Sequence, residues 1–393
     1  MSAPPDPARQ AALSRLIWTF GFTSFAGALA TRITDPLVAD IARDFAVLAG
    51  DAALLSSAFA LPYALVQPIL GPVGDAIGKR RVINFGLFVM AAMLVASAFA
   101  TSFGMLMVFR VLSGAAAGSV MPVTLAMIGD AVPLAQRQVA LSRLLTFAIA
   151  GQILGGAVAG PVAAIAGWRG VIALCAGISL LAASILLIQG LRRPPEPSGR
   201  FDITVALKRY RGILTNPVAL TLYASVSIEG ALVFGVFPFI APLLIARGIG
   251  DTAEAGLTVG AFSVGGLVYT FLARRLLSRL GQGRMVMLGG GLAACAFLSL
   301  AVAWAFPVVL LGGLLLGSGF FMIHNSIQTR VTEVAPQARG SAVAFHAFSF
   351  FTGQSLGPVL FGLGSGTAGV VPTLTVAAGG ILILSLVLGR RSA

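Results

Sequence analysis

Four ionisable side chains lie inside long apolar stretches of the chain: Arg32, Asp35, Arg110 and Glu229. A charged side chain at the centre of a lipid bilayer costs about 2.5–3.5 kcal/mol on insertion scales, so each one implies a partner, a proton or a ligand. Arg32 and Asp35 are three residues apart and are neighbours on one helical face, which favours either a local ion pair or a polar site. An aspartate held beside an arginine is a poor proton carrier near neutral pH.

Glu229 has a different surrounding, because the stretch 225–239 around it consists mainly of Val, Ile, Ala, Leu and Phe. An apolar environment disfavours the charged carboxylate, which suits a group that binds and releases a proton. Arg110 could instead neutralise Glu229 from another part of the chain. We therefore predict Glu229 and Asp35 as the proton-coupling residues, with Glu229 the stronger candidate of the two.

Composition shows which elements must hold these residues. Of the 393 residues 58% are hydrophobic and only 10% are charged, with a mean hydropathy of +0.97, whereas soluble domains carry roughly 25% charged residues. A helix needs about 20 mostly apolar residues to cross the hydrocarbon core. Segments of this kind run at Leu16–Pro36, Ala53–Val73, Val82–Thr101, Gly104–Ile128, Val139–Ile165, Gly170–Leu191, Val218–Ala241, Thr252–Phe271, Met285–Phe306, Val308–Gln328, Ala342–Phe361 and Gly369–Leu388. The fold class expected is an all-α integral membrane protein with twelve transmembrane helices.

The net charge of +13 indicates orientation in a membrane and not nucleic-acid binding, because of where the bases lie. Most of the 26 Lys and Arg fall in the loops on the side of the two termini, and the opposite loops keep Arg43, Arg169 and Arg247. An excess of bases marks the cytoplasmic side. We expect a multi-pass protein of a bacterial-type inner (plasma) membrane with both termini in the cytoplasm.

Motifs for other chemistries are missing from the sequence. It contains no P-loop, no Cys/His cluster with zinc spacing and no Gly-x-Ser-x-Gly elbow, which argues against an ATP-driven pump and a membrane hydrolase. The sequence therefore predicts no enzyme activity, no cofactor and no metal site.

A short loop between the second and third apolar segments reads Gly71-Pro-Val-Gly-Asp75-Ala-Ile-Gly78-Lys79-Arg80-Arg81. This pattern resembles the loop between helices two and three of the major facilitator superfamily of secondary transporters. The resemblance implies a gating motif at the cytoplasmic face, where the two halves meet. Its residues are Gly71, Asp75, Gly78, Lys79, Arg80 and Arg81. Arg137 and the start of the eleventh segment near Gly340 are the expected partners of Asp75.

Internal repeats agree with this resemblance. Gly151-Gln152-Ile-Leu-Gly155 recurs as Gly353-Gln354-Ser-Leu-Gly357, 202 residues later (353 − 151). Two halves with a degenerate repeat are the architecture of such transporters, whose substrate site lies between them. We expect two six-helix bundles related by a pseudo-twofold axis, at residues 1–191 and 217–393, joined by a cytoplasmic linker at 192–216.

Further stretches carry the resemblance over nearly the whole chain. Arg110-Val-Leu-Ser-Gly114 is similar to the family's Arg-x-x-x-Gly pattern, and Asp35–Phe45 resembles drug–proton antiporters and sugar-efflux relatives. Gly156-Ala-Val-Ala-Gly160-Pro161 is similar to the glycine-proline motif of the exporting branch, although the motif's last glycine pair is Ala163 and Ala164 here.

By the same resemblance, helices one, four, seven and ten line the substrate cavity. The residues that this implies on them are Arg32, Arg110, Phe234, Phe237, His324, Asn325 and Gln328, with Tyr63, Gln67, Gln152, His346 and Gln354 on helices of second rank. The function expected is proton-coupled export, that is antiport, of small organic molecules or drugs by alternating access. The alternative is a proton symporter that imports a small organic anion or nutrient. The expected partners are a small-molecule substrate, protons and lipid, with no nucleic acid, and the expected state is a monomer.

Overall fold

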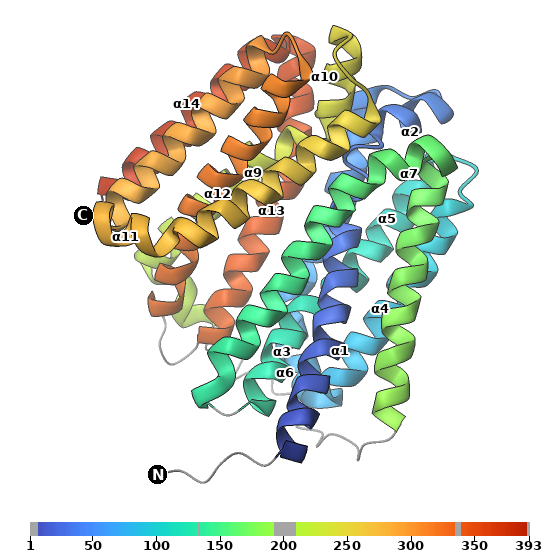
Figure 1. Cartoon of the computed structure of the whole chain (residues 1–393), viewed down its shortest axis with the longest axis vertical. Helices are drawn as coiled ribbons and strands as arrows, with labels where there is room; N and C mark the ends of the chain where they lie inside the picture. The colour runs from blue at the N-terminus through green and yellow to red at the C-terminus, as the bar shows by residue number, and fades with distance from the viewer. Residues whose placement is uncertain (1–6, 133, 192–209, 335–338, 391–393) are drawn as a thin grey trace.

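The computed structural model describes residues 7–132, 134–191, 210–334 and 339–390, and all regular structure in these ranges is helical. Figure 1 shows long, slanted helices running between two ends of the molecule. Their bounds are α1 Pro7–Arg32, α2 Val38–Asp44, α3 Ala49–Ile77, α4 Lys79–Ala98, α5 Phe103–Ala117, α6 Val120–Ala131, α7 Leu134–Leu191, α9 Pro217–Gly235, the 3₁₀ turn η1 Phe237–Phe239, α10 Ile240–Arg247, α11 Thr252–Val302, α12 Phe306–Val334, α13 Arg339–Thr367 and α14 Val370–Arg390.

The described helices make twelve passes, as the apolar segments predict. Eight stretches are long and apolar enough to span a membrane by length and composition, and two of them, Thr146–Leu191 and Thr252–Val302, contain a non-helical glycine at which the chain doubles back (Figure 1). Those eight stretches therefore hold ten passes, and α1 and α13 add two more. We call the end where α1 begins and α3 turns into α4 the basic end, because it carries Lys79, Arg80 and Arg81. The opposite end, with α2 and α10, is the α2–α10 end.

Tight turns between successive passes fall on glycines at the repeat spacing. Gly78 and Gly281 have φ of 98° and 70° and are 203 residues apart (281 − 78), while Gly167 and Gly369 have φ of 66° and 91° and are 202 apart (369 − 167). Positive φ is costly for residues with a Cβ atom, so glycine suits each turn. The two halves therefore share their turn geometry as well as their sequence motif.

Helix contacts repeat at the same spacing. A Cβ atom on Gly151 would lie 2.4 Å from the carbonyl oxygen of Phe25, and one on Gly353 would lie 1.9 Å from that of Ser227. Both partners are shifted by 202 residues (227 − 25), so α7 packs on α1 as α13 packs on α9. Small residues permit such close helix approach. This equivalence is the pseudo-twofold relation of two six-helix bundles.

Each half has its own apolar core. One large cluster of buried side chains draws its members from α1 to α7 and includes Phe20, Phe59 and Leu94, and the other draws them from residues 213–388 and includes Phe234, Phe297 and Ile381. The halves meet mainly through α3 against α13 and α7 against α11.

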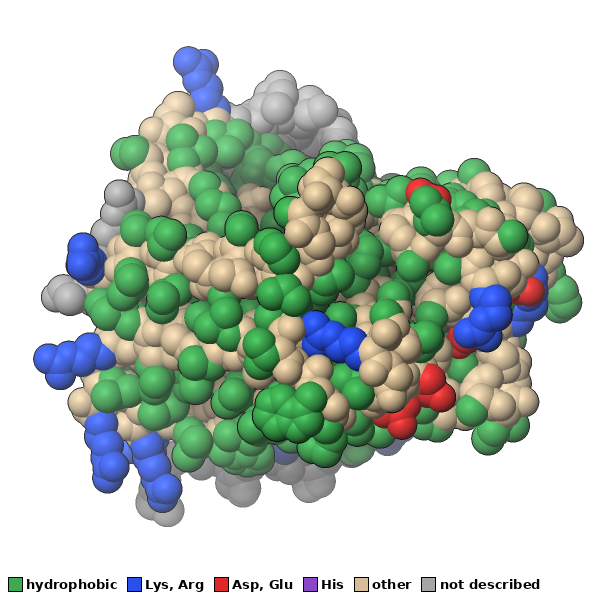
Figure 2. Space-filling model, turned by 90° about the horizontal axis from the view of Figure 1, so that it is seen from above, with side chains coloured by type: hydrophobic (Ala, Val, Ile, Leu, Met, Phe, Trp, Pro, Cys, Tyr) green, Lys and Arg blue, Asp and Glu red, His purple; other side chains and the backbone are tan. Residues whose placement is uncertain are grey.

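The outside of the molecule is strongly apolar. Ile165, Phe271 and Phe85 are 90%, 84% and 72% exposed. Figure 2, which looks onto the α2–α10 end, shows green hydrophobic side chains spread across the whole face among tan atoms, with acidic side chains in its right-hand part. An apolar surface of this extent matches lipid and not water.

Candidate functional site

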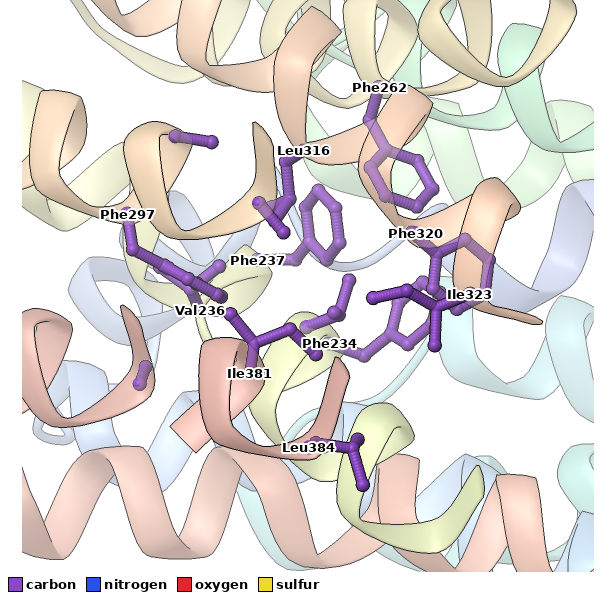
Figure 3. Close-up of a cluster of buried hydrophobic side chains, with 14 of the residues drawn as sticks. Phe234, Val236, Phe237, Phe262, Phe297, Leu316, Phe320, Ile323, Ile381 and Leu384 are labelled. Atoms are coloured by element: carbon purple, nitrogen blue, oxygen red, sulfur yellow. The ribbon is translucent and has the colours of Figure 1, made fainter. Parts of the chain in front are cut away.

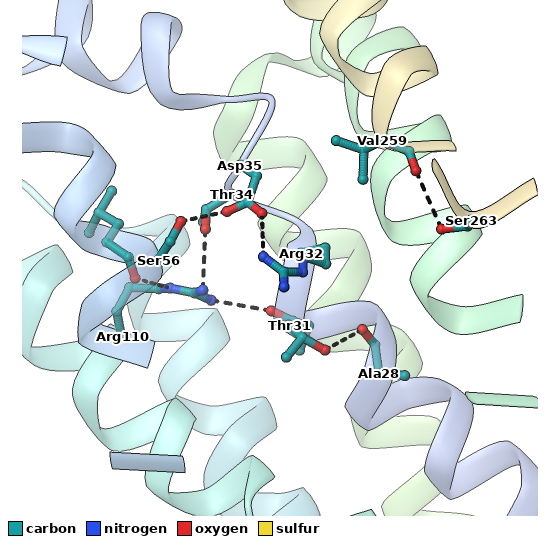
Figure 4. Close-up of polar contacts among 11 residues, drawn as sticks. Ala28, Thr31, Arg32, Thr34, Asp35, Ser56, Arg110, Val259 and Ser263 are labelled. Carbon is teal, nitrogen blue, oxygen red and sulfur yellow. Dashed lines mark hydrogen bonds and ion pairs between the residues drawn. The ribbon is translucent and has the colours of Figure 1, made fainter. Parts of the chain in front are cut away.

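A buried polar network occupies the first half near the end of α1. Arg32 is the last residue of α1, and its Nη1 lies 3.0 Å from Oδ2 of Asp35 in the turn that follows. Ser56 of α3 donates its hydroxyl to Oδ1 of Asp35, and Arg110 of α5 donates from Nη2 to Oγ1 of Thr34 at 3.2 Å (Figure 4). The structure therefore contains the local ion pair that was one of the two alternatives for Arg32 and Asp35. Asp35 is fully buried.

Arg110 does not contact Glu229, so the suggestion that it neutralises this carboxylate is wrong for this structure. Its guanidinium is fully buried, lies 4.4 Å from the centre of the Phe59 ring and donates to the Ala30 carbonyl at 3.4 Å. All of these contacts stay within the first half, where the packing of α5 against α1 and α3 holds the side chain. The network thus brings together two guanidinium groups and one carboxylate.

Glu229 instead pairs with His324, a partner that sequence reasoning did not assign. Oε2 of Glu229 lies 2.9 Å from Nδ1 of His324, and the glutamate side chain is fully buried. Its second oxygen, Oε1, has no hydrogen-bond partner among the described residues. A residue of α13, His346, lies next to this pair, with its ring centre 5.0 Å from that of His324. The structure therefore gathers three titratable side chains from α9, α12 and α13.

A cluster of phenylalanines adjoins the pair. The Phe234 ring centre lies 5.5 Å from that of Phe237, and edge-to-face contacts at 5.6, 5.1 and 5.5 Å join Phe234 to Phe262, Phe320 and Phe350. Figure 3 shows Phe234, Phe237, Phe262 and Phe320 converging from three helices and η1. The sequence predicted Phe234 and Phe237 but not the other three, because spacing within one helix says nothing about rings on another.

Arg32 joins this cluster to the polar network of the first half. Its guanidinium carbon lies 3.9 Å from the centre of the Phe234 ring and 5.5 Å from that of Phe237. A guanidinium over an aromatic face is an attractive contact. The polar and aromatic parts of the predicted site are thus one continuous group across the two halves.

The remaining predicted cavity residues have other surroundings. Tyr63 lies on Phe351 of the opposite half with ring centres 3.9 Å apart, and Gln67 donates to the Gly118 carbonyl at 3.2 Å. Residue 122, four positions after Gly118, is proline and has no backbone N–H to offer that carbonyl. Gln354 is buried, Gln152 and Asn325 are half-buried and Gln328 is exposed. Among the described contacts, none joins Gln152 or Gln328 to the Glu229–His324 pair.

The predicted gating motif is partly described. Gly78 makes the turn, Lys79 pairs with Asp130 at 2.9 Å and Arg80 lies 5.7 Å from the centre of the Phe20 ring, while Arg81 is exposed. Asp130 was not expected as a partner. The surroundings of Gly71 and the side chains of Asp75 and Arg137 lie outside what the structure describes, so the predicted Asp75 contacts stay predictions.

The glycine-proline motif lies at the contact between the halves, toward the α2–α10 end. A Cβ atom on Gly160 would lie 2.5 Å from Cα of Ala253, and one on Gly256 would lie 2.7 Å from the carbonyl oxygen of Gly156. Pro161 sits inside α7 directly after this contact. Backbones approach this closely only where no Cβ intervenes.

Polar contacts reinforce the same end. Thr252 donates its hydroxyl to Oδ2 of Asp40 at 2.8 Å, and Ser57 donates to the Ser355 carbonyl at 2.6 Å. Each of these bonds joins the first half to the second. The halves are therefore held together on this side of the buried site.

Two six-helix bundles with repeated packing, an apolar exterior and charged side chains buried in each bundle are typical of a polytopic membrane transporter. The family model of the Major Facilitator Superfamily matches residues 20–358. The chain belongs to this superfamily, and it is a transporter and not an enzyme.

Relatives agree over nearly full length. An uncharacterized MFS-type transporter, YceJ of Bacillus subtilis, is 24% identical over 361 residues and covers 88% of each chain. The quinolone resistance protein NorA of Staphylococcus aureus is 23% identical over 358 residues, covering 89% of this chain and 90% of the relative. The crystal structure of a bacterial homolog to the human lysosomal transporter Spinster, inward-facing and unoccupied, superposes with a TM-score of 0.73 at 17% identity, covering 99% and 98% of the two chains. This last likeness supports the fold alone.

Proposed function

We propose that the chain is a proton-coupled exporter of small organic molecules that works by alternating access. The observation that carries the proposal is the Glu229–His324 pair, whose atoms are 2.9 Å apart in the interior of the second half. A carboxyl and an imidazole at hydrogen-bond distance can share one proton, and they titrate as a coupled unit. Such a pair stores a proton between the two faces of a membrane.

Substrate and the first half compete for the same aromatic surface in this proposal. Arg32 covers the Phe234 ring at 3.9 Å and is itself held by Asp35. An aromatic or cationic molecule on Phe234 takes the place of the Arg32 guanidinium and so loosens a contact between the halves. Protonation of Glu229 removes a buried negative charge close by and weakens the binding of a cation, which couples the two events.

The relatives support the direction of transport. NorA is named a quinolone resistance protein, and the glycine-proline motif of the exporting branch is placed at the contact between α7 and α11. We further propose a monomer in a bacterial-type inner membrane with the basic end in the cytoplasm, since bases mark that side. The membrane potential contributes about 2.3 kcal/mol per charge per 100 mV to such exchange. Bundle boundaries at 1–191 and 217–393 belong to the same proposal.

A proton symporter that imports a small organic anion is the second candidate. The observation that favours it is the excess of positive charge in the buried polar network of the first half, which contains the guanidiniums of Arg32 and Arg110 but only the carboxylate of Asp35. An anionic substrate would balance this charge, whereas a cation would add to it.

Proteoliposomes with a trapped pH dye distinguish the two candidates. Protein is reconstituted with an acidic lumen, and ethidium as an aromatic cation and benzoate as an organic anion are added outside in turn. Export by antiport predicts that ethidium alkalinises the lumen. Symport predicts that benzoate carries protons inward with it and acidifies the lumen. An absence of proton movement with every member of a wider panel of cations and anions would contradict proton coupling.

A further inference from the structure

His346 extends the Glu229–His324 pair by one more titratable side chain. The rings of His324 and His346 have centres 5.0 Å apart and planes inclined by 62°. The His346 residue is 3% exposed, and its Nε2 atom has no hydrogen-bond partner among the described residues. An unpartnered buried nitrogen is costly unless it serves a purpose.

The three residues differ in how far along their helices they lie from the basic end. Glu229 lies twelve residues into α9 from Pro217, His324 lies ten residues from the end of α12 at Val334, and His346 lies seven residues into α13 from Arg339. At 1.5 Å per residue these positions are about 18, 15 and 10 Å from the basic ends of their helices. His346 is therefore the member nearest the basic end.

The side chains between His346 and the basic end are not fully enclosed. Ala344 and Phe345, which precede His346 on α13, are only half-buried, and Gln328 on α12, one turn beyond His324, is exposed. In the opposite direction, His324 is enclosed by Phe320 and Phe350, with ring centres 4.9 and 4.7 Å away. The buried pair is thus closed off by rings on one side and continued by His346 on the other.

Other titratable groups on the helices packed against α13 have different partners or positions. Tyr223 of α9 donates its hydroxyl to the Ala342 carbonyl at 3.2 Å, and Tyr63 of α3 lies on Phe351. Arg330 and Glu333 follow His324 on α12 toward the basic end, Asp51 lies at the opposite end of α3, and α14 has no ionisable side chain before Arg390. His324 is the titratable neighbour in ring contact with His346.

We propose that His346 relays the proton between the Glu229–His324 pair and water at the basic end, a role that rests on the proposed proton coupling. For release, the Glu229 carboxyl transfers its proton to Nδ1 of His324, which leaves a carboxylate and an imidazolium. His324 then loses a proton from its other nitrogen, Nε2, to Nε2 of His346 after a small ring rotation. His346 gives the proton to water and returns to the neutral form. One proton leaves in total, and His324 ends as the Nδ1–H tautomer, whose N–H donates to the Glu229 carboxylate.

A pH jump on the full-length protein in phosphatidylethanolamine–phosphatidylglycerol vesicles tests the relay without a transported substrate. Time-resolved infrared spectroscopy follows the carboxyl band of Glu229, which is identified by its loss in Glu229→Gln. We expect His346→Gln to reach the same final amplitude as wild type, because the pair itself is intact. Its rate should fall by about a hundredfold or more, the lower end of what a positioned proton donor or acceptor contributes.

Chemical rescue separates proton transfer from packing. In His346→Ala, added imidazole should restore the rate, whereas pyrazole, which has a similar size but is a much weaker base, should not. An unchanged rate in His346→Gln, or equal rescue by both molecules, would overturn the relay and leave the Glu229–His324 pair as the proton carrier. A wild-type protein in which no Glu229 band titrates would overturn the proposed proton coupling and the relay together.

Discussion

The guanidinium carbon of Arg32 lies 3.9 Å from the centre of the Phe234 ring, and the two residues are 202 positions apart (234 − 32), the spacing of the internal repeat. A residue that touches its own counterpart in the other half must lie close to the pseudo-twofold axis. Arg32 and Phe234 therefore mark that axis at the interface between the bundles. A change in the angle between the halves must act on this contact.

Replacing Asp35 by Asn should destabilise the fold strongly. The Arg32 and Arg110 guanidiniums would remain buried without a carboxylate, and loss of one partner from a buried ion pair costs about 3–5 kcal/mol. Asp40→Asn is the matched control, because Asp40 also pairs with an arginine three residues away, Arg43, whose side chain is 73% exposed. The amide oxygen of the new Asn can still accept the hydrogen bond that Thr252 donates to Asp40. Exposed pairs contribute about 0–1 kcal/mol. Thermal unfolding in detergent compares them, and equal shifts would contradict the account.

A methyl group at Gly160 should force the halves apart at the α2–α10 end. Its Cβ would lie 2.5 Å from the Ala253 Cα, which real contacts do not allow, so α7 and α11 must separate. Spin labels on cysteines introduced at Ala164 and Ile249, with both native cysteines replaced, should report longer distances in Gly160→Ala. Gly177→Ala in the second pass of α7 has open space around the new Cβ and should leave the distribution unchanged. No lengthening in Gly160→Ala would contradict the close contact.

Tyr210 should stabilise α3 through a carbonyl that a proline leaves free. Its hydroxyl donates to the Pro68 carbonyl, whose usual helical donor is missing because residue 72 is proline and has no backbone N–H. Tyr210→Phe should cost about 1 kcal/mol, the net contribution of one hydrogen bond. In a Pro72→Ala background the new N–H supplies the donor, so the same change should cost less. Equal costs in both backgrounds, measured by denaturant unfolding, would contradict this assignment.

Asp44 should make a small contribution to stability that acid removes. Its hydrogen bond from Arg169, helped by one from Trp168, lowers the pKa of this carboxyl below its usual value of 3.8. A carboxyl with a lowered folded-state pKa stabilises the protein above the unfolded-state pKa and loses that contribution as pH falls through the folded-state value. The difference in melting temperature between wild type and Asp44→Asn should therefore shrink on acidification from about pH 6 to pH 3. A difference that grows toward acid would contradict the assigned ion pair.

Much of the fold could be predicted from the sequence because length and apolarity alone define a membrane span. Glycine turns and the repeated Gly151 and Gly353 motifs could be predicted too, since a positive φ and a close backbone contact each require glycine. Both constraints are local to one segment. The equivalence of these glycine positions in the two halves followed from the repeat spacing.

Partners between distant helices could not be predicted in this way. Glu229 and His324 are 95 residues apart in sequence (324 − 229). Which faces of α9 and α12 meet depends on how each helix is rotated about its axis, and a helix that is apolar on all sides gives no sequence signal for this rotation. For the same reason the sequence left open a contact between Arg110 and Glu229 that the structure does not contain. Phe262, Phe320 and Phe350 were missed because phenylalanine in a membrane helix faces lipid as readily as a site.

The most direct test of the central claim is to measure proton-driven accumulation of substrate by the Glu229→Gln variant. With the substrate found in the vesicle screen, wild type should accumulate it against its gradient when a pH gradient is imposed. The amide cannot exchange a proton with His324, so the variant should fold with an unchanged melting profile and show no proton-driven accumulation. Accumulation driven by protons at the wild-type level in Glu229→Gln would contradict the account and remove Glu229 from the mechanism.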